Sequence, residues 1–207
     1  LLSVFLIIFT GNYLYGKHKI YNSNYKFDKD FNIKIISPNF SLEDYKVQSE
    51  IFQLKRLIKI SNPEKNKKTL FIWPEGIFYE STLQNLELYK NLFIDKFSKN
   101  HLIVLGINNF VSSKNSKDQK YFNSLVILNH QLEILSIYNK VNLVPFGEFL
   151  PFEKTFSKFG LKKITSGYNS FSPGDIRTTI NLGAQFNEKL ILPLICYEII
   201  YSGKIKK

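Results

Sequence analysis

Three residues that lie far apart in the chain could together supply a nucleophile, its base and a charge that stabilises an oxyanion. Cys196, the single cysteine, stands in the run Leu-Pro-Leu-Ile-Cys-Tyr-Glu. Glu75 ends the run Trp-Pro-Glu after one apolar stretch, and Lys140 follows another. A carboxylate can take a thiol proton and return it to a leaving group, while an ammonium can hold charge on an attacked carbonyl. These residue types predict covalent catalysis by a cysteine.

A second carboxylate, Glu148, lies eight residues beyond Lys140, across the turn Pro-Phe-Gly. That turn can fold Glu148 back against Lys140. The carboxylate would then keep the lysine charged and oriented toward the site. Each residue alone has an ordinary explanation, because a lone cysteine in an apolar run is commonly a small core residue. The prediction of a shared site therefore depends on Glu75, Lys140 and Cys196 together, in this order and with their neighbours.

Other chemistry-bearing residues do not favour a different class of site. His18, His101 and His130 are far apart, and no pair has the spacing of metal ligands. The sequence also has no glycine-rich phosphate loop and no Gly-x-Ser-x-Gly elbow. We therefore expect no metal and no cofactor.

The elements that must position these residues alternate between strands and helices. Apolar runs predict strands at 32–36, 69–73, 101–107 and 190–195, and a hairpin of 121–128 and 132–138. Serine caps and apolar spacing predict helices at 41–60 and 81–98. The expected apolar face of the second helix consists of Leu83, Leu86, Leu88, Phe93 and Phe97.

This order predicts one α/β domain with a mixed sheet. Glu75, Lys140 and Cys196 are each expected at or just past the end of a strand. Sites in such sheets form at strand ends, where the chain turns away. The three side chains are therefore expected to share one pocket.

The chain opens with an uncharged apolar run, residues 1–9. Alone it is too short for a bilayer core, which needs roughly 20 helical residues. A signal-peptide core and a buried core element remain alternatives, but the aromatic and basic residues that follow suit a membrane interface. Because the chain contains no methionine, we expect an internal fragment. Its expected parts are the end of a transmembrane helix (1–15), a linker (16–30) and an incomplete catalytic domain (31–207).

Composition limits the partners of this domain. The 207 residues are 44% hydrophobic, which suits one domain with a sizeable core. A net charge of +11 fits either solvated lysines or attraction to an anionic membrane surface. The lysines are scattered and no nucleic-acid motif accompanies them, so no nucleic-acid partner is expected. One cysteine excludes an internal disulfide and leaves the compartment open.

Residues 149–174 mix aromatic side chains with lysines. This mixture is typical of a loop that lies on or dips into the lipid headgroup layer. An ordinary surface loop that packs its aromatic rings on the core is the alternative. The residues expected to face lipid are Phe149, Phe152, Phe156, Phe159, Tyr168 and Phe171.

Three runs taken together resemble the nitrilase superfamily, whose catalytic triad is glutamate, lysine and cysteine. They are Trp73-Pro-Glu75, Tyr138-Asn-Lys-Val-Asn-Leu-Val-Pro-Phe-Gly-Glu-Phe-Leu-Pro151 and Ile195-Cys-Tyr-Glu198. The last two runs are similar to one branch, the apolipoprotein N-acyltransferases. The resemblance implies an α-β-β-α sandwich on the periplasmic side of the bacterial inner membrane. It also implies that final strands and a last transmembrane helix are missing on the C-terminal side.

The resemblance further implies a ping-pong transfer of an acyl chain. Cys196 would attack the acyl ester of a phospholipid and form a thioester. The free amine of the diacylglyceryl-cysteine of an apolipoprotein would then accept the chain. Glu75 would be the general base and Lys140 the oxyanion partner, supported by Glu148, Tyr197 and Glu198.

Two other functions remain open at this stage. The same triad could belong to a soluble carbon–nitrogen hydrolase, such as an amidase or nitrilase, in which water resolves the thioester. A non-enzymatic module that binds a membrane surface is the second alternative. It would use the basic charge alone and would keep Cys196 as an inert core residue.

Overall fold

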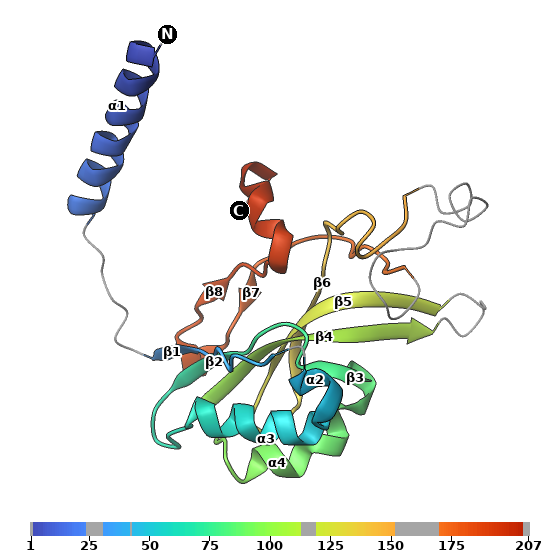
Figure 1. Cartoon of the computed structure of the whole chain (residues 1–207). Helices are drawn as coiled ribbons and strands as arrows, with labels where there is room; N and C mark the ends of the chain where they lie inside the picture. Colours follow the sequence, from blue (N-terminus) through green and yellow to red (C-terminus); the bar gives the residue numbers. More distant parts are fainter. Residues whose placement is uncertain (1, 24–30, 42, 113–118, 152–169, 205–207) are drawn as a thin grey trace.

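The computed structural model describes residues 2–23, 31–41, 43–112, 119–151 and 170–204. Its centre is a six-stranded mixed sheet in the order β1-β2-β4-β5-β6, with β3 also paired to β4 (Figure 1). The strands are β1 (Asn32–Ile35), β2 (Thr69–Ile72), β3 (Phe78–Thr82), β4 (His101–Ser112), β5 (Gln119–Leu128) and β6 (Ile134–Asn139). The first three strands of the path run parallel, while β4, β5 and β6 run antiparallel. The predicted α/β class and the predicted hairpin are confirmed.

Successive apolar residues of the central strands point to opposite faces of the sheet. Leu70 and Leu102 belong to one buried cluster, whereas their neighbours Phe71 and Ile103 belong to another. A strand that is buried on both faces reads as a continuous apolar run rather than an alternating one. This explains the uninterrupted apolar stretches in the sequence.

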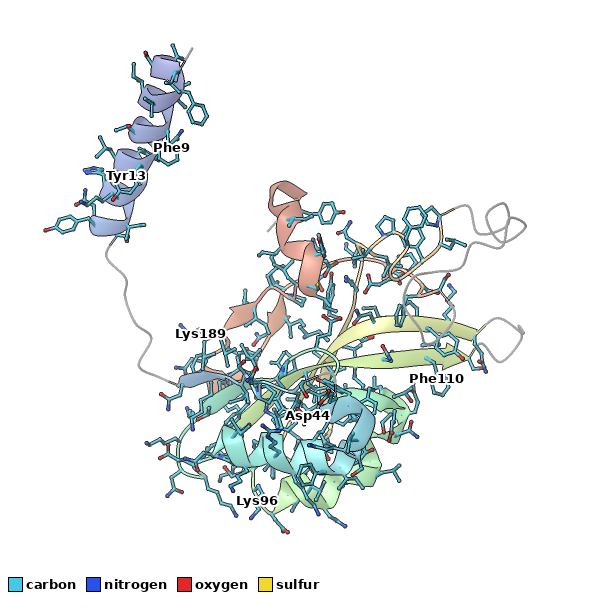
Figure 2. The ribbon with its side chains drawn as sticks, in the orientation of Figure 1. Phe9, Tyr13, Asp44, Lys96, Phe110 and Lys189 are labelled. Carbon is cyan, nitrogen blue, oxygen red and sulfur yellow. The ribbon has the colours of Figure 1, made fainter. Side chains whose placement is uncertain are left out.

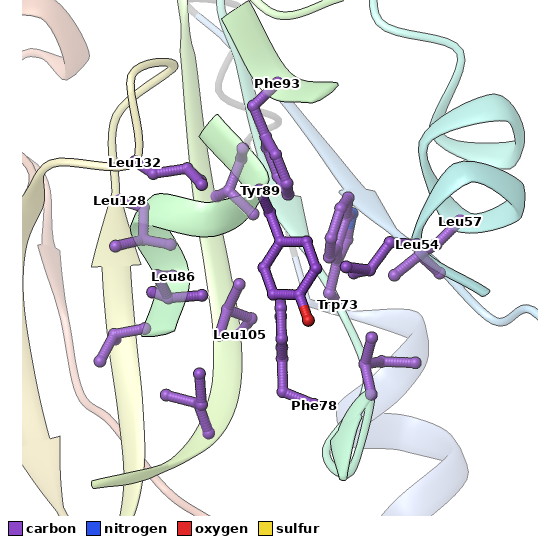
Figure 3. Packing of buried hydrophobic residues seen from close by; sticks show 14 of the residues in the cluster. Leu54, Leu57, Trp73, Phe78, Leu86, Tyr89, Phe93, Leu105, Leu128 and Leu132 are labelled. Atoms are coloured by element: carbon purple, nitrogen blue, oxygen red, sulfur yellow. The ribbon is translucent and has the colours of Figure 1, made fainter. Parts of the chain in front are cut away.

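Helical segments cover one face of this sheet (Figure 1). They are α2 (Asp44–Val47), α3 (Glu50–Ser61), the 3₁₀ segment η1 (Leu83–Tyr89) and α4 (Lys90–Ile94). Leu54 and Leu57 of α3 lie beside Trp73, and Phe93 of α4 also points into this core (Figure 3). The cluster is almost entirely apolar, so burial of hydrocarbon dominates its stability.

Both predicted helices differ in extent from the observed ones. The helix expected at 41–60 is two helices. The first begins at Asp44, whose N–H donates to Ser41 Oγ, and Ser49 is the N-cap of α3 with an extended backbone. The helix expected from Ser81 begins after Thr82 instead, since residues 78–82 form β3. Its expected apolar face is partly wrong, because Leu88 is 77% exposed.

The opposite face of the sheet packs against a smaller two-stranded sheet. This sheet consists of β7 (Ile180–Asn181) and β8 (Leu190–Ile191), joined by η3 (Ala184–Phe186) and followed by η4 (Cys196–Lys204). The strand predicted at 190–195 is shorter than expected. Pro193 has no N–H for a ladder, and the N–H of Ile195 donates to a Glu198 side-chain oxygen instead.

The chain begins with helix α1 (Leu2–Tyr21), which stands apart from the sheet (Figure 1). Phe9 and Tyr13 lie on it, far from Lys96 in the helical layer and from Lys189 beside the small sheet (Figure 2). The helix continues past the position where the linker was expected to begin. Within the described residues, no helix combines the length and hydropathy needed to cross a membrane.

Candidate functional site

Glu75 follows β2 in a turn that brings it against β4. The N–H of Trp73 still donates to the Val104 carbonyl at 2.8 Å, so β2 pairing continues to this point. Gly76 then has a φ of 80°, a conformation that favours glycine. At Gly106 of β4, an added Cβ would lie 3.2 Å from the Glu75 Cα. A glycine at this position therefore gives Glu75 its space on the sheet.

Lys140 follows β6 and is buried, with 1% of its side chain exposed. Its Nζ donates to Glu148 Oε1 at 2.9 Å, and the N–H of Val144 donates to Glu148 Oε2 at 2.8 Å. The turn across residues 145–147 thus folds Glu148 back onto the lysine. A buried ammonium is costly unless an opposite charge accompanies it, and Glu148 supplies that charge.

Asn123 of β5 joins the two carboxylates of this cluster. Its Nδ2 donates to Glu75 Oε1 and to Glu148 Oε1, each at 2.8 Å. Its backbone carbonyl accepts the N–H of Lys140 at 2.8 Å. Glu75, Lys140 and Glu148 therefore lie around one amide, although they come from turns that are distant in the sequence.

Glu198 is a second buried carboxylate and connects the cysteine turn to the lysine segment. Its side chain is fully buried and accepts the N–H groups of Val141 and Asn142, each at 3.0 Å. It also accepts the N–H of Ile195 at 3.0 Å and the Tyr138 hydroxyl at 2.8 Å. The residues just after Lys140 and the residue just before the cysteine are thus bound to one carboxylate.

The charge of Glu198 is stabilised by its donors. Burial alone would raise the pKa of Glu198, but the N–H groups of Asn142 and Ile195, the Tyr138 hydroxyl and the Arg177 guanidinium hold that pKa below its ordinary value. Burial, followed by the hydrogen bond to Glu198, raises the pKa of Tyr138. The carboxylate is therefore ionised and the phenol neutral at pH 7.

Cys196 begins η4 and is exposed. It is therefore not the buried core residue that the non-enzymatic membrane-binding alternative would have. Its φ is 51°, a left-handed conformation that a non-glycine residue adopts at a cost of about 1–3 kcal/mol. Among the described residues, no hydrogen bond joins its sulfur to Glu75 or Lys140. The structure therefore connects Cys196 to the cluster through the backbone contacts of Glu198. Tyr197, the next residue, is 54% exposed.

Residues 170–174 lie against the lysine turn. The N–H of Gly174 donates to the Lys140 carbonyl at 2.8 Å, and that of Phe171 donates to the Glu148 carbonyl at 2.8 Å. Phe149 and Phe171 line a cavity of about 340 Å³ next to these contacts, together with Tyr201 of η4. The other four residues expected to face lipid, Phe152, Phe156, Phe159 and Tyr168, lie outside the described residues.

Sequence reasoning missed three polar residues of this region. Asn123 interrupts an apolar strand, which is a signal that could have identified it. Arg177 is one of only two arginines among 28 basic residues, and this rarity was a second signal. Tyr138 opens the lysine run of the family resemblance, but no role followed for it, because a tyrosine at a strand end is commonly a packing residue. In the described residues, no group of histidine, cysteine and carboxylate side chains could hold a metal ion.

The curated proteins to which this chain is similar include several that carry the same description, apolipoprotein N-acyltransferase. An apolipoprotein N-acyltransferase of Rhizobium leguminosarum is 24% identical, over 97% of this chain and 39% of the relative. One of Brucella suis is 31% identical, over 68% of this chain and 26% of the relative. The chain thus spans well under half the length of these curated relatives.

A solved structure, a mutant amidase from Nesterenkonia sp. AN1, has a TM-score of 0.36 and 12% identity, over 81% of this chain and 55% of that one. Such a likeness is too low to carry an argument. The family comparison is stronger, since residues 55–205 match the carbon–nitrogen hydrolase model. The matched range contains Glu75, Lys140 and Cys196, and the match agrees with the nitrilase-like motifs and the α/β fold. The chain belongs to the carbon–nitrogen hydrolase family.

Proposed function

We propose that this chain carries the catalytic centre of an N-acyltransferase of bacterial lipoproteins. The enzyme moves an acyl chain from a phospholipid to the N-terminal diacylglyceryl-cysteine of an apolipoprotein. The observation that supports this most is the polar cluster of Glu75, Asn123, Lys140 and Glu148, which adjoins an exposed cysteine turn held by Glu198. The names of the curated relatives support the choice of substrates.

In the first half-reaction, Glu75 takes the proton of the Cys196 thiol. The thiolate attacks the ester carbonyl of the phospholipid, and Lys140 stabilises the oxyanion of the tetrahedral intermediate. When that intermediate collapses, the carbon–oxygen bond breaks and Glu75 returns its proton to the leaving alkoxide. A lysophospholipid departs, and Cys196 carries the acyl chain as a thioester.

In the second half-reaction, the free α-amine of the lipoprotein attacks the thioester. Glu75 accepts a proton from the attacking nitrogen, and Lys140 again stabilises the oxyanion. The carbon–sulfur bond then breaks, the thiolate recovers its proton from Glu75, and the amide product leaves. Each half-reaction returns the enzyme to its starting protonation state.

The surroundings of the cluster suit lipid substrates. Phe149 and Phe171 line the cavity beside the lysine turn, and we assign it to the apolar chain of the donor. The sequence of residues 149–174 contains further aromatic residues and lysines, a composition typical of segments that meet anionic lipid headgroups. The site works at the periplasmic face of the inner membrane and needs no cofactor.

The test is transfer of a labelled acyl chain from phospholipid to a diacylated lipopeptide by the full-length protein. Wild-type protein should label the peptide, and Cys196→Ala should abolish labelling. The matched control is Thr179→Ala, an exposed residue outside the cluster, which should retain full activity. Transfer that survives Cys196→Ala would remove the proposed nucleophile.

A second candidate function is hydrolysis of a carbon–nitrogen bond, which the family match favours. In that case water, activated by Glu75, would resolve the thioester instead of an amine. Turnover of a simple amide in the absence of any lipopeptide, together with no peptide labelling, would favour this alternative. If neither activity depends on Cys196, the non-enzymatic membrane module is favoured.

A further inference from the structure

Glu198 lies between the two halves of the candidate site, and one cation accompanies it. Arg177 Nη2 donates to Glu198 Oε1 at 2.7 Å, and the arginine side chain is only 10% exposed. Among the described residues, the other titratable group in contact with Glu198 is Tyr138, whose hydroxyl donates to both carboxylate oxygens. Lys140 lies one residue before the Val141 contact but is paired with Glu148. Arg177 is therefore the counter-charge of Glu198.

Arg177 does more than neutralise this carboxylate. Its Nε donates to the Tyr138 hydroxyl at 3.1 Å, and its Nη2 also donates to Asn142 Oδ1 at 3.0 Å. Tyr138 lies two residues before Lys140 and Asn142 two residues after it, so these contacts bracket the lysine. Glu198 lies two residues after Cys196. One guanidinium thus joins the segment around Lys140 to the turn that carries Cys196.

The geometry requires an arginine rather than another cation. The planar guanidinium presents donors at fixed angles, whereas a lysine ammonium is a single point charge on a flexible stem. The chain is rich in lysine, yet an arginine stands here and at only one other position, Arg56. A lysine at 177 could keep the charge near Glu198 but could not reproduce all three contacts.

We propose that Arg177 is a positioning residue that fixes the Cys196 turn against the Lys140 segment by holding Glu198, a role that rests on the proposed function of these two residues. Without Arg177, the buried carboxylate is left uncompensated. It then either withdraws from its backbone donors, which frees the cysteine turn, or remains as an unpaired negative charge two residues from the thiol. Both results disturb the position or the charge surroundings of the sulfur that attacks the substrate.

The test measures alkylation of Cys196 by iodoacetamide in the full-length protein, followed by mass spectrometry of the peptide that carries it. Rates are measured across a pH series for wild type, Arg177→Gln and Arg177→Lys. The matched control is Arg56→Gln, which removes the other arginine. Arg56 lies on α3, where its guanidinium stacks 5.1 Å from the Phe40 ring centroid. Thermal unfolding establishes that each variant is folded.

Arg177→Gln should slow alkylation at pH 7 by about tenfold, because the uncompensated Glu198 carboxylate then lies two residues from the sulfur or the cysteine turn is no longer held. The kcat for acyl transfer should fall about 100-fold with KM almost unchanged, since misplacement affects the reacting geometry. Arg177→Lys should restore part of the alkylation rate and part of kcat. Arg56→Gln should have the alkylation rate and kcat of wild type. A folded Arg177→Gln protein with wild-type alkylation and wild-type kcat would overturn the proposal.

If Arg177→Gln does not fold, Arg177→Lys decides the question. Slower alkylation in the folded lysine variant supports the positioning role, and a wild-type alkylation rate overturns it. The alkylation measurement needs no acyl donor or acceptor. Absence of acyl transfer by wild-type protein would therefore end the proposed function without altering the alkylation result, so the two failures are distinguishable.

Discussion

The two faces of the central sheet are stabilised in different ways. The face under α3 and α4 is packed with aromatic rings, such as Phe93 and Phe97, which stack with centroids 5.5 Å apart. The other face ends in the candidate site, where Lys140 and Glu198 are almost completely buried and each has a partner of opposite charge. Hydrocarbon dominates the first region, whereas the second adds paired charges to its own buried apolar cluster.

This difference determines how each region responds to change. Removal of atoms from an apolar core costs free energy in proportion to the atoms lost and the cavity left. Removal of one member of a buried ion pair leaves the other charge uncompensated. The loss in the free energy of unfolding is then large even when few atoms are removed. We therefore expect core substitutions to reduce stability and leave activity unchanged, and site substitutions to reduce activity as well as stability.

The largest expected effect on the helical side comes from Phe93→Ala. Phe93 is completely buried against Trp73 and Phe97, and its truncation should cost about 3–5 kcal/mol in the free energy of unfolding. Denaturant unfolding measures this loss. The acyl-transfer kcat of the folded fraction should stay near wild type, and a selective loss of kcat would contradict the separation of the two regions.

On the site side, Lys140→Met should lower kcat by about 10²–10³, the usual cost of one lost oxyanion donor. Steady-state acyl transfer measures this change. Lys120→Met is the control, since Lys120 is an exposed lysine on β5, and its kcat should be unchanged. Equal kcat values for the two variants would show that the buried ammonium has no catalytic role.

A smaller effect is expected from acid. Because the pKa of Glu198 is lowered in the folded state, its stabilising contribution is present above the ordinary glutamate pKa of about 4.3 and is lost as pH falls through the folded value. In that pH range, uptake of one proton by Glu198 lowers the free energy of unfolding by at most about 1.4 kcal/mol for each pH unit. Glu198→Gln cannot titrate, so its stability should depend less steeply on acid pH. An unchanged slope would contradict this.

The smallest effect should come from Leu88→Ala. Leu88 was expected in the core, but it is 77% exposed on η1. Its truncation should change the free energy of unfolding by no more than about 0.5 kcal/mol. Denaturant unfolding beside Phe93→Ala would measure this contrast, and a loss above 2 kcal/mol (about half that of a core phenylalanine) would contradict the observed burial.

The sequence predicted those parts of the structure that local patterns determine. The strands at 69–73 and 101–107 and the hairpin follow from apolar runs and turn residues. The contact of Glu148 with Lys140 follows from a short turn between them. These features need only neighbours in the chain to be recognised.

Features that depend on distant partners were predicted only where a motif marked the residues, as for Glu75 and Lys140. The break before α3 and the strand β3 involve Glu50, whose buried carboxylate accepts the N–H groups of Glu80 and Ser81. The roles of Asn123 and Arg177 likewise depend on contacts with residues more than 20 positions away. No local pattern encodes such pairings, because they exist only once the sheet has formed.

The claim that Cys196 carries the acyl chain can be tested most directly by the intact mass of the full-length protein after incubation with phospholipid and no acceptor. We predict a mass increase of one acyl group that neutral hydroxylamine removes, as expected for a thioester, and that is absent in Cys196→Ala. An acyl adduct that persists in Cys196→Ala, or no adduct on active wild-type protein, would contradict the proposed mechanism.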